Sequence, residues 1–171
     1  KWYIRNRLRG ARIEKYVRRA FSLADTARRD IEDAAERVWE EEKTGPSKVA
    51  KTHEEIVEER YRALGRIAKA LRSGEKKVAA LQKTVAKGRR ADPNKGKVKE
   101  KQLTADELTE RLKLFDEFDQ SIPDMNQALD NAIAVVQEAR RLGRDASIAD
   151  KESALEKVKT ALEGVTDALD F

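Results

Sequence analysis

The sequence predicts an all-α protein: an elongated, coiled-coil-like antiparallel helical hairpin followed by two or three shorter helices. Charged residues make up 40% of the 171 residues and aromatic residues only 5%. The chain therefore has too few large apolar side chains to fill a thick core. Apolar residues recur at spacings of four and three, the pattern of a narrow helical seam. No segment alternates apolar and polar residues as a half-buried strand does.

The first helix is expected from about Trp2 to Glu42, and the Thr-Gly-Pro-Ser sequence at 44–47 ends it, because Gly and Pro cannot continue a helix. Its seam is rich in Ala, which permits close approach of a neighbour but buries little area. We favour packing within the chain over self-association, because the second helix supplies larger apolar residues. The seam residues are Ile13, Val17, Ala20, Ala24, Ala27, Ile31, Ala34 and Val38.

The second helix is expected from Ser47 to Lys87, or from Thr52 if the Thr52–Glu55 capping box forms. Ser73-Gly74 places poor helix formers within it, but the apolar register continues across them, so we expect a weak point or kink there rather than a full break. Residues 13–88 then form a hairpin roughly 60 Å long. The second seam consists of Val57, Leu64, Ile67, Leu71, Val78, Leu81 and Val85.

Residues 89–103 are predicted to be a basic linker, because Asp92-Pro93-Asn94 and Gly96 favour turns. Residues 104–171 form an acidic helical segment that packs on the hairpin or extends from it. Thr104 and Glu107 predict a capping box at its start. We expect new helix starts at Ser121, with Pro123 in the first turn, and at Ser147.

Charge is distributed unevenly along the chain, although the formal net charge is only +5. Residues 1–20 contain eight Lys/Arg and one acid, and residues 87–101 contain seven Lys/Arg and two acids. Residues 104–171 reverse the balance, with sixteen acids and eight bases. The N-terminal end is therefore suited to an anionic partner.

The segment 1–12 combines cations with aromatic and apolar residues, which suits the border between lipid headgroups and water. We expect it to be membrane-proximal, either following a transmembrane helix encoded upstream or lying on the membrane as an interfacial helix. This places the protein on the cytoplasmic side of a membrane. The candidate membrane- or anion-binding residues are Trp2, Tyr3, Arg5, Arg7, Leu8, Arg9 and Arg12.

A nucleic-acid-binding protein is the alternative, with the Arg-rich N-terminus and the 87–101 linker neutralising phosphates. The chain has no zinc-finger spacing and no aromatic-rich single-strand motif, which favours the membrane hypothesis.

Catalysis is not expected, because the chain has no Cys and His53 is its only His. His53-Glu54-Glu55 lacks the second His of a zinc protease, so we predict no metal, no cofactor and no small-molecule substrate. Trp39 lies beside the first seam near the hairpin turn, where a Trp more often packs on a neighbouring helix; if exposed, it is a candidate anchor for a protein partner. The sequence thus favours a non-catalytic scaffold or adaptor, whose acidic helices bind protein partners or other copies of the chain.

Overall fold

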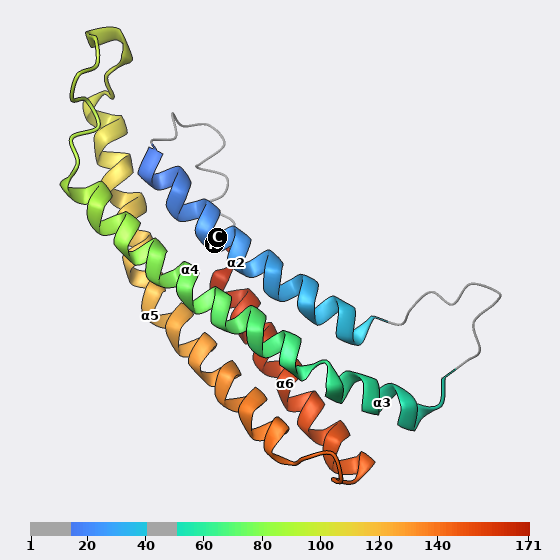
Figure 1. Ribbon diagram of the computed structural model, residues 1–171. Coiled ribbons are helices and arrows are strands. Elements are labelled where there is room, and N and C mark those ends of the chain that lie inside the picture. Colours follow the sequence, from blue (N-terminus) through green and yellow to red (C-terminus); the bar gives the residue numbers. More distant parts are fainter. Residues whose placement is uncertain (1–14, 41–50) are drawn as a thin grey trace, which may run out of the picture.

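The computed structural model describes residues 15–40 and 51–171, and every regular element in them is helical (Figure 1). This confirms the predicted all-α class and the antiparallel hairpin. The elements are α2 (Lys15–Trp39), α3 (His53–Arg62), α4 (Leu64–Arg90), the short 3-10 turn η1 (Lys99–Lys101), α5 (Ala105–Arg141) and α6 (Ile148–Leu169).

Helices α2 and α4 form the hairpin through the two predicted seams. A Cβ atom placed on Gly74 of α4 would lie 3.1 Å from the Cδ1 atom of Ile31. A Cβ atom placed on Gly88, near the C-terminal end of α4, would lie 2.9 Å from the Cβ atom of Tyr16 near the start of α2. These two approaches fix the antiparallel register. Among the described seam residues of α2, only Ala34 is not fully buried.

As expected, Ser73-Gly74 does not break the helix, because α4 runs through both residues. Gly74 is buried where Ile31 and Leu129 come close, so the missing side chain serves helix packing rather than bending. The interruption lies at Ala63, between α3 and α4, where the amide bonds to the carbonyl groups of both Glu59 and Arg60.

Helices α5 and α6 fold back onto the hairpin and complete an elongated four-helix bundle. Helix α5 packs along α4, α6 packs along α5, and α6 also contacts α2 and α3 (Figure 1). The long helices α2, α4, α5 and α6 therefore alternate in direction along the chain, and α3 continues along the line of α4 (Figure 1). The last residue, Phe171, is buried with its ring centroid 5.2 Å from that of Phe118.

The predicted helix start at Ser121 is also wrong, since α5 continues as one helix of 37 residues with Pro123 inside it. Pro123 lies on the exposed face of α5. Because proline has no N–H group, the carbonyl group one turn earlier loses its helical hydrogen bond, and on this face water can replace it. Ile122 and Met125 beside it are buried, and their packing outweighs the local cost of proline. The helical spacing of Leu108, Leu112, Phe115 and Phe118 in the sequence predicts that Leu112 is buried, but it is 46% exposed and Leu114 is buried instead.

The segment between α4 and α5 is shorter than predicted, because α4 continues to Arg90. Its turn is organised by Asn94, whose side-chain oxygen accepts a hydrogen bond from the Leu103 amide at 2.7 Å. Thr104 and Glu107 form the predicted reciprocal capping box on α5. Ser147 caps α6 by accepting from the Asp150 amide.

A polar clamp holds α3 against the α5–α6 turn. Lys151, fully buried, donates to Glu58 at 2.7 Å and to the Arg144 carbonyl at 2.6 Å. The Tyr61 hydroxyl donates to the Ala139 carbonyl at 2.8 Å and accepts from the Gly143 amide at 3.1 Å. The clamp therefore fixes the end of the bundle that is distant from the 91–104 loop.

Candidate anion-binding face and partner groove

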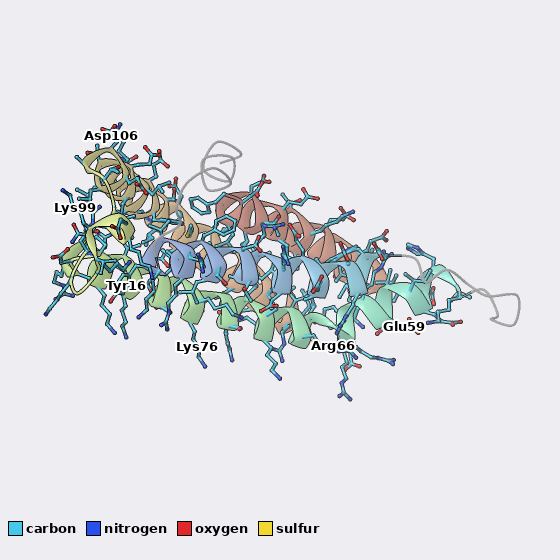
Figure 2. All side chains as sticks on the ribbon, turned by 90° about the horizontal axis from the view of Figure 1, so that it is seen from above. Tyr16, Glu59, Arg66, Lys76, Lys99 and Asp106 are labelled. Atoms are coloured by element: carbon cyan, nitrogen blue, oxygen red, sulfur yellow. The ribbon has the colours of Figure 1, made fainter. Side chains whose placement is uncertain are left out.

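The seven N-terminal candidate residues, Trp2, Tyr3, Arg5, Arg7, Leu8, Arg9 and Arg12, lie outside the described residues. The structure nevertheless shows which end of the bundle they join. Helix α2 begins at Lys15, and the next residue, Tyr16, lies against Gly88 near the end of α4. Helix α2 thus begins at the end of the bundle that carries the 91–104 loop, as the labelled Tyr16 and Lys99 show (Figure 2).

The described end of the first basic stretch, residues 15–20, therefore lies at the same end of the bundle as the second basic stretch. Arg18 and Arg19 are exposed on the first turns of α2. Lys95, Lys97, Lys99 and Lys101 are exposed on the neighbouring loop. We call this region the cationic end. Two segments far apart in the chain thus contribute to one local positive potential.

A longer positive surface runs along α4, which contains nine Lys/Arg and a single acid, Glu75. Figure 2 shows side chains of α4, including those of Arg66 and Lys76, pointing away from the bundle. At 1.5 Å per residue the 27-residue helix extends for roughly 40 Å. We call the exposed cations the cationic face: Arg66, Lys69, Arg72, Lys76, Lys83, Lys87 and Arg90.

The cationic face lies opposite the buried seam of α4, within about a third of the helix circumference. None of its members forms an ion pair with another of the described residues. The two cations of α4 nearer the neighbouring helices are paired instead, Lys77 with Asp30 at 2.6 Å and Arg89 with Asp119 at 2.7 Å. The cationic face is thus free to meet an external anion.

Arg89 belongs to the interface between α4 and α5 rather than to the cationic face. Its hydrogen bonds to Asp116 and then to Asp119 raise its pKa above the usual arginine value, against a smaller lowering by burial. Arg111 is buried nearby, donates to the Gly88 carbonyl and lies 4.8 Å from the centre of the Phe115 ring. These two arginines hold the helices together.

The sequence reasoning missed the cationic face, because it counted charges in consecutive windows. The spacing of the cations does predict this face, since none of the exposed Lys/Arg of residues 66–90 occupies a position of the apolar seam. Plotting charge around the helix as well as along the chain would have revealed it.

Trp39, the predicted partner anchor, lies at the end of α2 and is half-buried. It packs on the core and also lines a groove of about 290 Å³ between α2 and α6. The floor of the groove includes Ala35 and Leu162, and carboxylates surround it. The lining residues are Glu32, Ala35, Glu36, Trp39, Glu40, Lys159, Leu162, Glu163 and Thr166.

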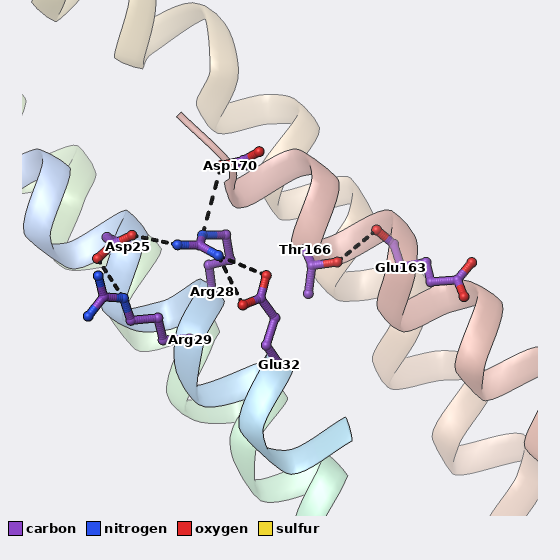
Figure 3. A network of polar contacts seen from close by, with 7 residues as sticks. All are labelled: Asp25, Arg28, Arg29, Glu32, Glu163, Thr166 and Asp170. Carbon is purple, nitrogen blue, oxygen red and sulfur yellow. Dashed lines mark hydrogen bonds and ion pairs between the residues drawn. The ribbon is translucent and has the colours of Figure 1, made fainter. Parts of the chain in front are cut away.

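An ion-pair network lies beside this groove (Figure 3). Arg28 donates to Asp25 and to Glu32, both at 2.8 Å, and its Nε atom lies 4.0 Å from the Asp170 carboxylate near the end of α6. The hydrogen bond to Asp25 raises the pKa of Arg28, burial opposes it, and Glu32 raises it further. Arg28 therefore links α2 to the end of α6 and forms an ion pair with Glu32.

Within residues 15–40 and 51–171, no three potential metal ligands come together. His53 is exposed. Among the described residues its one polar contact is with Glu152, where the His53 Nε2 atom lies 3.1 Å from a carboxylate oxygen. Over the same residues, no helix combines the length and apolar character needed to cross a bilayer.

Comparisons with models of protein families, with curated protein sequences and with solved structures find no significant match to this chain. The class of protein is therefore defined by the fold, an antiparallel four-helix bundle with one strongly cationic side.

Proposed function

We propose that this protein is a non-catalytic helical scaffold or adaptor that binds an anionic membrane surface from the cytoplasmic side. The cationic end and the cationic face of α4 contact the lipid headgroups. The acidic helices α5 and α6 point away and bind protein partners or further copies of the chain. The observation that carries the proposal is the roughly 40 Å row of unpaired cations on α4.

The energetics of such a surface are favourable and depend on salt. Each Lys or Arg held near an anionic leaflet contributes about 1 kcal/mol. The seven cations of the face together supply at most about 7 kcal/mol, which corresponds to a dissociation constant of about 10 μM. Because the contacts are exposed, the Debye length of about 8 Å at physiological ionic strength weakens them as salt rises.

The membrane is favoured over nucleic acid by the composition of the attached N-terminal segment. Trp2, Tyr3, Ile4 and Leu8 provide aromatic and apolar groups beside the cations, as headgroup-level residues do. The cationic face itself carries no aromatic side chain on which a base could stack. Phosphate neutralisation by the same cations is the competing outcome that the experiment must exclude.

The test is co-sedimentation of the full chain with vesicles of phosphatidylcholine alone or mixed with phosphatidylserine. We expect binding only to the anionic vesicles, with an affinity that falls as salt increases. A triple variant of the cationic face should lose about 3 kcal/mol, roughly a hundredfold in affinity. Its substitutions are Arg66→Gln, Lys69→Gln and Lys76→Gln.

A matched control removes the same charge from the opposite side of the bundle. Arg140→Gln, Arg144→Gln and Lys157→Gln neutralise exposed cations of α5, the following turn and α6. This variant should bind anionic vesicles almost as well as the unaltered chain. Equal losses for both triples would mean that net charge alone drives binding, and the cationic face would have no special role.

Mobility-shift experiments with single- and double-stranded oligonucleotides at low salt address the alternative. No shift under conditions where vesicles are bound would support the membrane proposal. Tight, salt-dependent binding of oligonucleotides without vesicle binding would replace it with the nucleic-acid hypothesis.

A further inference from the structure

The groove between α2 and α6 joins an apolar floor to a negatively charged rim, on a different side of the molecule from the cationic face. Trp39, Ala35 and Leu162 provide the apolar floor. In Figure 2, α6 lies on the far side of the bundle from the labelled side chains of α4. A ligand in the groove would therefore not compete with a surface bound by α4.

The rim on α2 is a regular row of carboxylates. Glu32 and Glu36 on α2, and Glu40 directly after its end, follow one another at intervals of four residues. Because the Glu40 amide still bonds to the Glu36 carbonyl, the three are spaced about 6 Å apart along one side. Glu163 faces them from α6, and among the described lining residues Lys159 is the only cation.

Most of this negative charge has no partner within the described part of the chain. Glu32 is held by Arg28 at 2.8 Å, whereas no described cation forms an ion pair with Glu36, Glu40 or Glu163. Three carboxylates around an apolar surface repel one another, and a cationic ligand would relieve that repulsion.

The half-buried indole of Trp39 supplies the second component of recognition. Its inner part packs on the core, so the side chain is already ordered before a ligand binds. A preordered Trp loses little conformational entropy on binding, which is why Trp is frequent among the residues that dominate binding energy at interfaces.

We propose that this groove binds a cationic amphipathic helix of a partner protein. An apolar stripe of that helix packs on Trp39 and Leu162. Lys or Arg residues at intervals of four flank the stripe and match the 6 Å spacing of the carboxylates on α2. The inference names the kind of partner that the adaptor function requires, but the groove and its assay do not depend on membrane binding.

The test measures binding of labelled synthetic helices to the full chain by fluorescence anisotropy. The probe is an 18-residue peptide, a length of about five helical turns, with a Leu stripe flanked by Lys at intervals of four. Two peptides of the same length serve as controls, one with Glu in place of every Lys and one with the same composition in scrambled order. We expect only the amphipathic cationic peptide to bind.

Charge-neutral variants locate the binding site without altering the size of the side chains. Glu36→Gln, Glu40→Gln and Glu163→Gln together should weaken binding of the peptide at least tenfold. A matched triple on α5, away from the groove, should change it less than twofold. Its substitutions are Asp124→Asn, Asp130→Asn and Glu138→Gln.

A separate readout reports on the indole. In a Trp2→Phe background Trp39 is the sole Trp, and its emission should shift to shorter wavelength when the peptide binds.

Absence of peptide binding, equal weakening by both triples, or equal binding of the scrambled peptide would overturn the proposal. Sedimentation equilibrium tests a second copy as the occupant: a dimer that the groove triple dissolves, together with no peptide binding, would assign the groove to self-association instead. Peptide binding without vesicle binding would refute only the membrane proposal.

Discussion

Four glycines lie inside the described helices, so the substitution of Gly by Ala can be compared in four environments. Gly88 leaves the least space for an added Cβ atom. A Cβ atom at Gly88 would lie 2.5 Å from the Cζ atom of Phe115 and 2.9 Å from the Cβ atom of Tyr16. Real Cβ contacts are not that short, so α2 or the Phe115 ring must move. Phe115 is fully buried, and the Tyr16 Cβ atom moves only with the backbone of α2.

The expected effect of Gly88→Ala is a loss of stability. Replacing Gly with Ala in a helix normally stabilises by about 1 kcal/mol, since Ala has the higher helix propensity. Overpacking a filled site costs typically 1–3 kcal/mol, and the backbone contact with α2 places Gly88 at the upper end. The net loss in the free energy of unfolding is therefore about 1–2 kcal/mol, or several degrees in Tm.

The other three glycines provide internal controls. Gly65 and Gly164 have no heavy atom within 4 Å of an added Cβ, so Ala should stabilise at each by about 0.5–1 kcal/mol. At Gly74 the contacts are 3.1 Å and 3.3 Å, and both are with the ends of flexible side chains, Ile31 and Leu129. Those ends can rotate, so the propensity gain and the packing cost should nearly cancel.

The measurement is urea denaturation of the four single variants, followed by far-UV circular dichroism. The predicted order of stability is Gly164→Ala and Gly65→Ala above the unaltered chain, Gly74→Ala near it and Gly88→Ala below it. A stabilised Gly88→Ala variant would show that α2 does not pack on α4 as closely as described. The antiparallel register of the hairpin would then have to be revised.

Three further variants test other parts of the bundle. Lys151→Met removes the buried ammonium that bonds to Glu58 and should cost about 2–3 kcal/mol in denaturant unfolding, whereas Lys157→Met on the exposed face should change stability by less than 0.5 kcal/mol. Pro123→Ala should stabilise by about 1–3 kcal/mol, and a loss instead would mean that the packing of α5 requires the proline. Thr104→Ala removes the cap of α5 and should lower the unfolding free energy by about 1 kcal/mol, an effect that Thr104→Ser should largely avoid.

Much of the bundle could be predicted from the sequence, because the information is local. The seams of α2 and α4 follow from heptad spacing, and the buried Val57, Leu71 and Val85 all belong to the predicted set. The caps at Thr104 and Ser147 follow from the chemistry of side chains that accept from the backbone.

The wrong helix start at Ser121 and the unforeseen packing role of Gly74 both reflect tertiary packing that overrides local preference. Gly74 and Pro123 are poor helix formers, yet both lie within continuous helices. Gly74 lets three helices come together, and the exposed Pro123 is flanked by buried residues. Neither circumstance is visible without knowing the neighbours of each position.

The candidate sites were predictable only in part. Trp39 was identified from its place beside the seam, but the groove also needs Leu162 and Glu163, which lie more than 100 residues further along the chain. The spatial relation between α2 and α6 depends on how the second pair of helices folds back. Seam spacing alone does not determine that choice.

The segregation of charge between α4 and the two C-terminal helices gives the bundle a permanent electric dipole moment across its width. In the field of a charged surface such a molecule rotates during its approach, so it arrives with α4 forward more often than random tumbling would allow. Productive encounters are then faster at low ionic strength and slow down as counterions accumulate. The same torque turns the Trp39 side away from that surface, toward the solution from which another macromolecule would come.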